Sequence, residues 1–255
     1  TAHSTSGGAS GSMRVCTGDS DDAGSGSVGL STGESLNGPG GNIGIIVGSG
    51  TKSFSGNLSL AAGNTSSLVG KAGGVQIDAG SSYNEDKDSM ASGGDVYIQG
   101  GSTFGGHLEA SGGNVTIEAG FAVGGAGGST VISSGSSLNH DSGHVTLETA
   151  RATKNSDSGS VSIYTGDVDA GRAGDITVST GKSVVGESGD IAVHVGGAHV
   201  GDGGKISLEA GDTSSMYGLG GDVVVHAGNS MHKRGGAIVL MSGAGYETSS
   251  GDVSI

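Results

Sequence analysis

A phrase of about nine residues, roughly Gly-Gly-x-Val-x-Ile-x-Ala-Gly, recurs along the whole chain, in copies such as GGNVTIEAG, SGDIAVHVG and GGDVVVHAG. Counted by the first large apolar residue of each copy, from Met13 to Val253, there are sixteen copies. Ten of the fifteen intervals between copies are 15 residues, and the others are 16, 17, 17, 19 and 21. Repetition of this kind indicates one small structural unit that is used many times.

Each copy has apolar residues two positions apart, such as Val161 and Ile163, followed two positions later by a small residue such as Thr165. Alternate residues of a strand share one face, so this spacing predicts a strand. The copies share one phase, and the loops between them are longer than hairpins favour. The pattern therefore predicts an all-β, parallel β-solenoid of about 16 coils, with a roughly 15-residue repeat and two main sides. A coil of 30 residues is the alternative.

The predicted core is a ladder of apolar pairs, one pair stacked on the next. One coil buries side chains worth about 6 kcal/mol, but ordering its backbone costs roughly 1–2 kcal/mol per residue, so a coil depends on its neighbours. A weaker second side is expected from apolar residues in the intervening stretches, such as Leu138, Val184 and Tyr246. The glycines that bracket each strand predict sharp corners, because glycine adopts backbone angles that other residues avoid. Typical ladder residues are Val115, Ile117, Val145, Leu147, Val161, Ile163, Ile176, Val178, Ile191, Val193, Ile206, Leu208, Val223 and Val225.

Composition excludes several other classes of protein. The chain has 57 Gly and 1 Pro in 255 residues, without the three-residue glycine period of collagen. A disordered linker would not need a phased apolar pattern, and dense glycine with a period of two argues against helices. We therefore expect one repeat domain over residues 1–255, with residues 1–11 less regular and the last copy cut after Ile255 as in a piece of something longer.

Charge and cysteine content limit the partners. The formal net charge is −14, and the 11 Lys and Arg residues are scattered, which argues against nucleic-acid binding. No apolar run is long enough to predict a membrane span. The single cysteine, Cys16, excludes internal disulfides and is interpreted as an inert thiol, with a cross-link to a second chain as the alternative. Asn-x-Ser/Thr triplets at Asn57, Asn64 and Asn114 are glycosylation candidates that suit an extracellular protein.

A solenoid would align equivalent positions in columns, and two columns contain metal-ligand residue types. Asp175 and Asp190 would lie side by side without a partner, as either a weak Ca²⁺ site or solvated turn residues. His194, Glu209 and His226 have side chains suited to zinc or copper, but a straight column spaces them awkwardly for one metal, and ordinary surface residues are the alternative. Neither group is a firm metal site, and no cofactor or catalytic residue is expected. The insertion at 81–92, which carries Tyr83, is the best candidate for a local binding feature.

The repeated GGDV-x-I-x-x-G pattern resembles Gly/Ser-rich β-solenoid repeat proteins of the secreted, cell-surface or filament-forming type. The resemblance covers nearly the whole chain and implies a structural or adhesive role outside the cell. We expect a non-enzymatic segment of a surface fibre, filament or matrix, which associates with itself or with neighbouring repeats, end to end or side by side. The alternatives are a module that binds ice, glycan or Ca²⁺ through one flat face, and a β-helix enzyme acting on polysaccharides.

Overall fold

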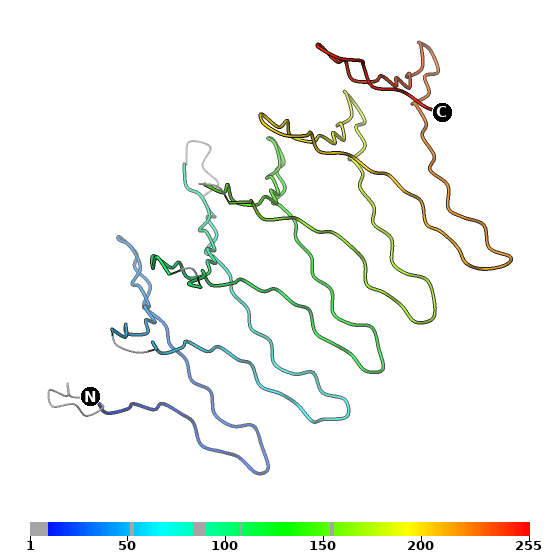
Figure 1. The fold of residues 1–255 in the computed structure, drawn as a ribbon. Coiled ribbons are helices and arrows are strands. Elements are labelled where there is room, and N and C mark those ends of the chain that lie inside the picture. The colour runs from blue at the N-terminus through cyan, green and yellow to red at the C-terminus, as the bar shows by residue number, and fades with distance from the viewer. Residues whose placement is uncertain (1–9, 52–53, 84–89, 108, 154–155) are drawn as a thin grey trace. The chain divides into compact units, whose positions relative to one another are not determined.

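The computed structural model describes residues 10–51, 54–83, 90–107, 109–153 and 156–255. In these residues there is neither a helix nor a β-strand, and extended stretches alternate with bends (Figure 1). The predicted all-β solenoid is therefore wrong. A β-sheet requires the N–H and C=O groups of neighbouring strands to pair, and the extended stretches described here do not pair along their length.

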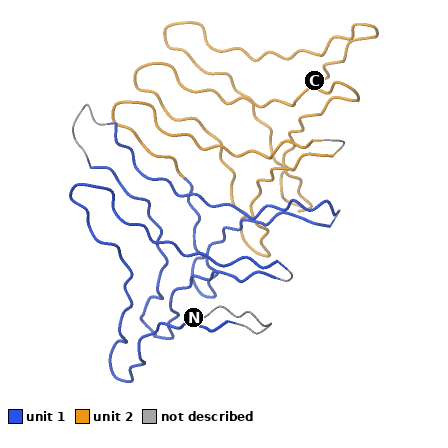
Figure 2. Cartoon of the chain, turned by 90° about the vertical axis from the view of Figure 1, so that its left-hand side faces the viewer, with its two compact units in different colours: residues 1–132 blue, residues 133–255 orange. Residues whose placement is uncertain are grey.

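The chain divides into two compact units, Thr1–Ile132 and Ser133–Ile255 (Figure 2). Both units are built from the same alternation of extended segment and loop. The single repeat domain predicted for residues 1–255 stays a prediction.

Each repeat combines an extended segment of constant length with a loop of variable length. The segment begins at the glycine two residues before the first apolar residue, which we call the base glycine, and ends seven residues later, as in 113–120 and 221–228. The repeat intervals of 17, 19 and 21 residues all arise in the loops, such as 63–73, 101–113 and 80–94. Insertions therefore lengthen the loops and leave the extended segments unchanged.

At the base of each loop, the base glycine faces the small residue that follows the preceding apolar pair, which we call the base residue. A Cβ added to Gly221 would lie 3.3 Å from Cβ of Ala210, and one added to Gly204 would lie 2.7 Å from Cγ1 of Val195. These separations leave little or no room for a side chain, which accounts for the glycine at these two loop bases.

The bracketing glycines were expected to form sharp corners through unusual backbone angles, but none of the described base glycines has a positive φ. Tight approach of two chain segments is seen instead at bases such as Gly204 and Gly221. Among the residues that the structure describes, the glycines with positive φ are Gly171, Gly186 and Gly201, with φ of 125°, 113° and 103°. All three lie at the same place inside three successive loops.

The size of the base residue decides whether a backbone hydrogen bond closes the loop. In eight loops the base-glycine N–H donates to the carbonyl after the base residue at 2.8–3.0 Å, as from Gly236 to Gly228. The base residue of these closed loops is always small: Ala62, Ala79, Gly100, Ala119, Ser134, Ala210, Ala227 or Ser242. In the open loops, which lack this bond in the described residues, the base residue is always β-branched: Thr17, Thr32, Val47, Thr149, Thr165, Thr180 or Val195.

The physical cause is steric, because a β-branched side chain keeps the two backbones apart. In the open loops at Thr17 and Thr32 the side chain compensates, since its hydroxyl donates to the carbonyl of Gly26 or Gly41 at 3.2 Å. The alanines at closed bases, such as Ala119 and Ala227, are half-buried. Most of the few half-buried residues that the structure describes are base residues of closed loops.

No described hydrophobic side chain is buried. Residues of the predicted second side, such as Leu138 and Tyr246, lie in bends of the loops and are almost fully exposed. They do not face the apolar pairs, so the prediction of a core with two sides is also wrong. The ladder residues are 51–77% exposed and do not stack as predicted: Val115, Ile117, Val145, Leu147, Val161, Ile163, Ile176, Val178, Ile191, Val193, Ile206, Leu208, Val223 and Val225.

Candidate functional site

The residues that sequence analysis grouped as a possible zinc or copper site lie on separate repeats. His194, Glu209 and His226 are all exposed. Glu209 accepts a hydrogen bond from the Ser207 hydroxyl at 3.1 Å. Among the described residues no three His, Cys, Asp or Glu side chains come close enough to hold one metal ion. The column that would have aligned these three depended on stacked coils, and the structure does not contain such a stack.

Asp175, which was expected to lie beside Asp190 without a partner, forms an ion pair with Arg172. Nη2 of Arg172 lies 2.8 Å from Oδ1 of Asp175 and donates a hydrogen bond to it. Both side chains are well exposed, so this ion pair contributes little to stability. Asp190 is exposed and belongs to the next repeat. The Asp175 carboxylate thus has a cation from its own loop, which corrects the expectation that this aspartate is unpartnered.

The three glycosylation candidates, Asn57, Asn64 and Asn114, are exposed. Asn57 and Asn114 occupy the same position, between the base glycine and the first apolar residue, whereas Asn64 lies in a loop. Since alternate residues of an extended chain face opposite ways, Asn57 and Asn114 lie on the face opposite the apolar residues. A glycan at either position would leave the apolar face uncovered.

The most extensive feature that the structure presents is an apolar stripe, which we define as the first and second apolar residues of each extended segment. In the segment 221–228 these are Val223 and Val225, which are 59% and 64% exposed. The opposite face of the same segment presents Asp222, Val224 and His226. The stripe recurs along the chain because the segment length is constant, although Thr130 replaces the first apolar residue in segment 128–135.

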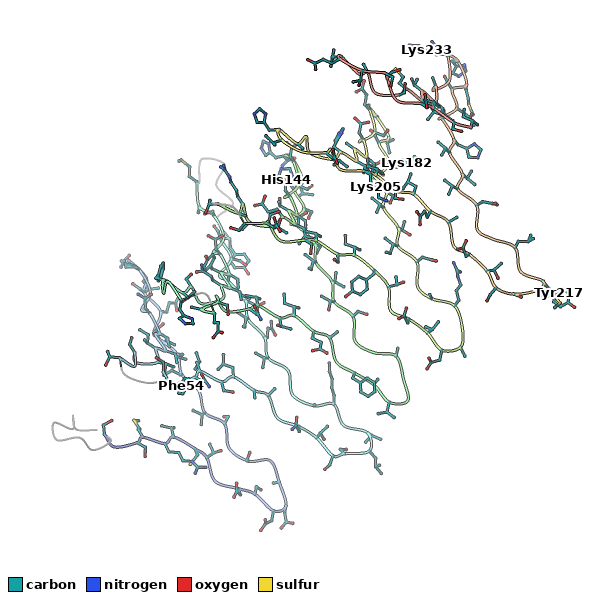
Figure 3. The ribbon with its side chains drawn as sticks, in the orientation of Figure 1. Phe54, His144, Lys182, Lys205, Tyr217 and Lys233 are labelled. Carbon is teal, nitrogen blue, oxygen red and sulfur yellow. The ribbon has the colours of Figure 1, made fainter. Side chains whose placement is uncertain are left out.

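The loops form the second exposed feature. Tyr217 and Lys233 lie at the outer ends of their loops (Figure 3). Several loops are stabilised locally by a serine hydroxyl near the loop start, as where Ser137 accepts from the N–H of His140 at 3.1 Å and Ser230 from that of Lys233 at 3.0 Å. In the insertion 81–92, residues 84–89 lie outside the described residues. The base of this loop is closed by a hydrogen bond from the Gly94 N–H to the Gly80 carbonyl at 2.8 Å. No pocket is present in the part of the chain that the structure describes.

Sequence analysis missed the contact between base residue and base glycine. Its signal was present, because glycine stands two residues before the first apolar position in all sixteen copies, where a turn alone would tolerate other residues. The small residue that follows each apolar pair was expected to belong to the face of the strand that lines the core. In the structure it lies opposite the base glycine instead.

No protein family, no curated protein and no solved structure matches this chain. Within the described residues, no helix is both long and apolar enough to cross a lipid bilayer.

Proposed function

We propose that this chain is a non-enzymatic structural segment of an extracellular fibre, filament or matrix, which associates with further copies of itself. The observation that carries the proposal is the uniformity of the repeat. The extended segments have the same length, and nearly all of them present an exposed apolar pair, while differences in length are confined to the loops. An assembly built from equivalent contacts needs this kind of repetition, in which many weak contacts add up.

Charge and composition support the same role. The acidic net charge of −14 favours solubility before assembly, and small polar residues dominate the loops. Exposed Asn57, Asn64 and Asn114 are compatible with passage through a glycosylating secretory pathway. Side chains that differ between repeats, such as His194, Glu209 and His226, do not gather into a metal-binding group in the described part of the chain.

The proposal is tested by locating the protein in its source cells. Immunogold labelling and fractionation should place it outside the cell, in material that is released by denaturant rather than by detergent alone. A soluble intracellular antigen would contradict the proposal. Digestion with an amidase that removes N-glycans provides a second readout, since a secreted chain carrying glycans would lose mass.

A further inference from the structure

Each extended segment has two surfaces that the chain itself leaves uncovered. The first is the apolar stripe, typified by Val223 and Val225, and the second is the row of backbone N–H and C=O groups along the segment. The described residues contain ten backbone–backbone hydrogen bonds, of which eight close loop bases and two lie within loops. A folded chain of this length usually has about 170 such bonds.

The accessible surface leads to the same conclusion. The chain exposes 25906 Å², whereas a compact protein of 24.2 kDa exposes about 10,000 Å². The difference is roughly ten times the surface that a standard protein–protein interface covers. The segments therefore offer far more surface for association than one partner contact needs.

We propose that copies of this chain associate through their extended segments, which pair side by side through the free backbone groups and pack together through the apolar stripe. This inference rests on the proposed structural function and specifies the surface that the assembly uses. An exposed extended segment with unpaired backbone groups is a template for pairing with another chain.

The constant segment length identifies a second copy as the partner. A partner must present apolar residues in extended segments of the same length, with intervening loops that do not obstruct the contact. Another copy meets this condition along the chain, because insertions such as 80–94 and 101–113 lengthen only the loops. Identical segments also place like side chains beside one another, which allows close packing of Val and Ile.

The charges are placed so that this contact does not bury them. Asp175, Asp190, Asp222 and Asp252 each precede the first apolar residue of their segment, so they lie on the face opposite the stripe. The glycosylation candidates Asn57 and Asn114 occupy the same position. A copy can therefore cover the stripe without desolvating carboxylates, which would be costly.

The test compares two sets of substitutions with the same added charge on opposite faces of the same segments. The stripe variant carries Val223→Asp, Val225→Asp, Ile238→Asp and Leu240→Asp. The control variant carries Val224→Asp, His226→Asp, Val239→Asp and Met241→Asp, whose native side chains are also exposed. Association of the full 255-residue chain is followed by sedimentation velocity over a range of concentrations, together with far-ultraviolet circular dichroism on dilution.

We expect the native chain to associate as concentration rises, with a parallel gain of β-structure signal. The stripe variant should associate more than about 100-fold more weakly, because burying unpaired carboxylates is very unfavourable. The control should change by about twofold, as is usual for surface positions.

Two outcomes would overturn the inference. If both variants were weakened equally, the contact would not be specific to the stripe. If the native chain stayed monomeric at all concentrations, with or without β-structure, a second copy would not be the partner. Neither result depends on where the protein is located, so failure of this inference can be told apart from failure of the proposed function.

Discussion

Replacing Ala227 by Val should open one loop base and leave the others closed. In the native chain the Gly236 N–H donates to the Gly228 carbonyl at 2.9 Å, and a Cβ added to Gly236 would lie 3.4 Å from that of Ala227. The two extra methyl groups of Val would occupy the space that Gly236 fills at the native loop base. The native loops with Val at this position, at Val47 and Val195, lack the bond.

The size of the effect follows from the loss of one hydrogen bond. An exposed bond of this kind contributes about 1 kcal/mol net, which corresponds to a roughly fivefold change in the opening equilibrium. The Gly236 amide should therefore exchange its hydrogen with solvent about fivefold faster in Ala227→Val than in the native chain. Nuclear magnetic resonance of glycine-labelled protein measures this rate directly.

The reverse substitution provides the complementary test. Thr180→Ala should allow Gly189 to approach the carbonyl of Gly181, and exchange of the Gly189 amide should slow by a similar factor. His226→Val and Ser179→Val serve as controls, because each adds or keeps bulk on the neighbouring residue, which faces the other way. Unchanged exchange at both Gly236 in Ala227→Val and Gly189 in Thr180→Ala would refute the argument that side-chain size controls loop closure.

Three further predictions concern individual positions. Gly204→Ala should displace the loop base at Val195, since the new Cβ would lie 2.7 Å from its Cγ1; chemical shifts should change across 195–204, whereas Gly203→Ala, with open space around it, should leave them unchanged. Gly186→Ala should cost roughly 1 kcal/mol locally, because Gly186 has φ of 113°; increased exchange of neighbouring amides would show the cost, and native exchange rates would argue against strain. Zinc binding measured by calorimetry should be the same for the native chain and for Glu209→Gln, because His194, Glu209 and His226 do not converge in the described structure; a marked loss of zinc affinity would show that they do.

Local conformation was predictable from the sequence. The period of two across pairs such as Val161 and Ile163 predicted a strand, and the structure has extended segments that alternate with bends but no strand in the described residues (Figure 1). The stretches between them were expected to connect the segments and also to form a weaker second side; they connect the segments, but their apolar residues, such as Leu138, are exposed. These features depend on residues close together in the chain, so a local pattern is sufficient to predict them.

Pairing between segments could not be inferred in the same way. The spacing of Val161 and Ile163 is the same whether their segment stacks on the next repeat, pairs with another chain or stays unpaired. Equal spacing therefore led to a predicted ladder, and with it to a predicted column of His194, Glu209 and His226. The described residues form neither the ladder nor the column. Candidate sites that depend on stacking could be no more reliable than the stack itself.

By itself the sequence determined the repeat, the constant eight-residue segment, the face on which each apolar residue lies and the absence of internal disulfides. The tertiary structure alone decided that the segments remain unpaired and that the loop bases are the places of closest contact. The physical reason is that backbone direction is set by neighbouring residues, whereas contact between distant residues depends on space. Ala227 permits the close approach of Gly236, while Thr180 keeps Gly189 at a greater distance, and this difference appears only when both sides of the loop base are in view.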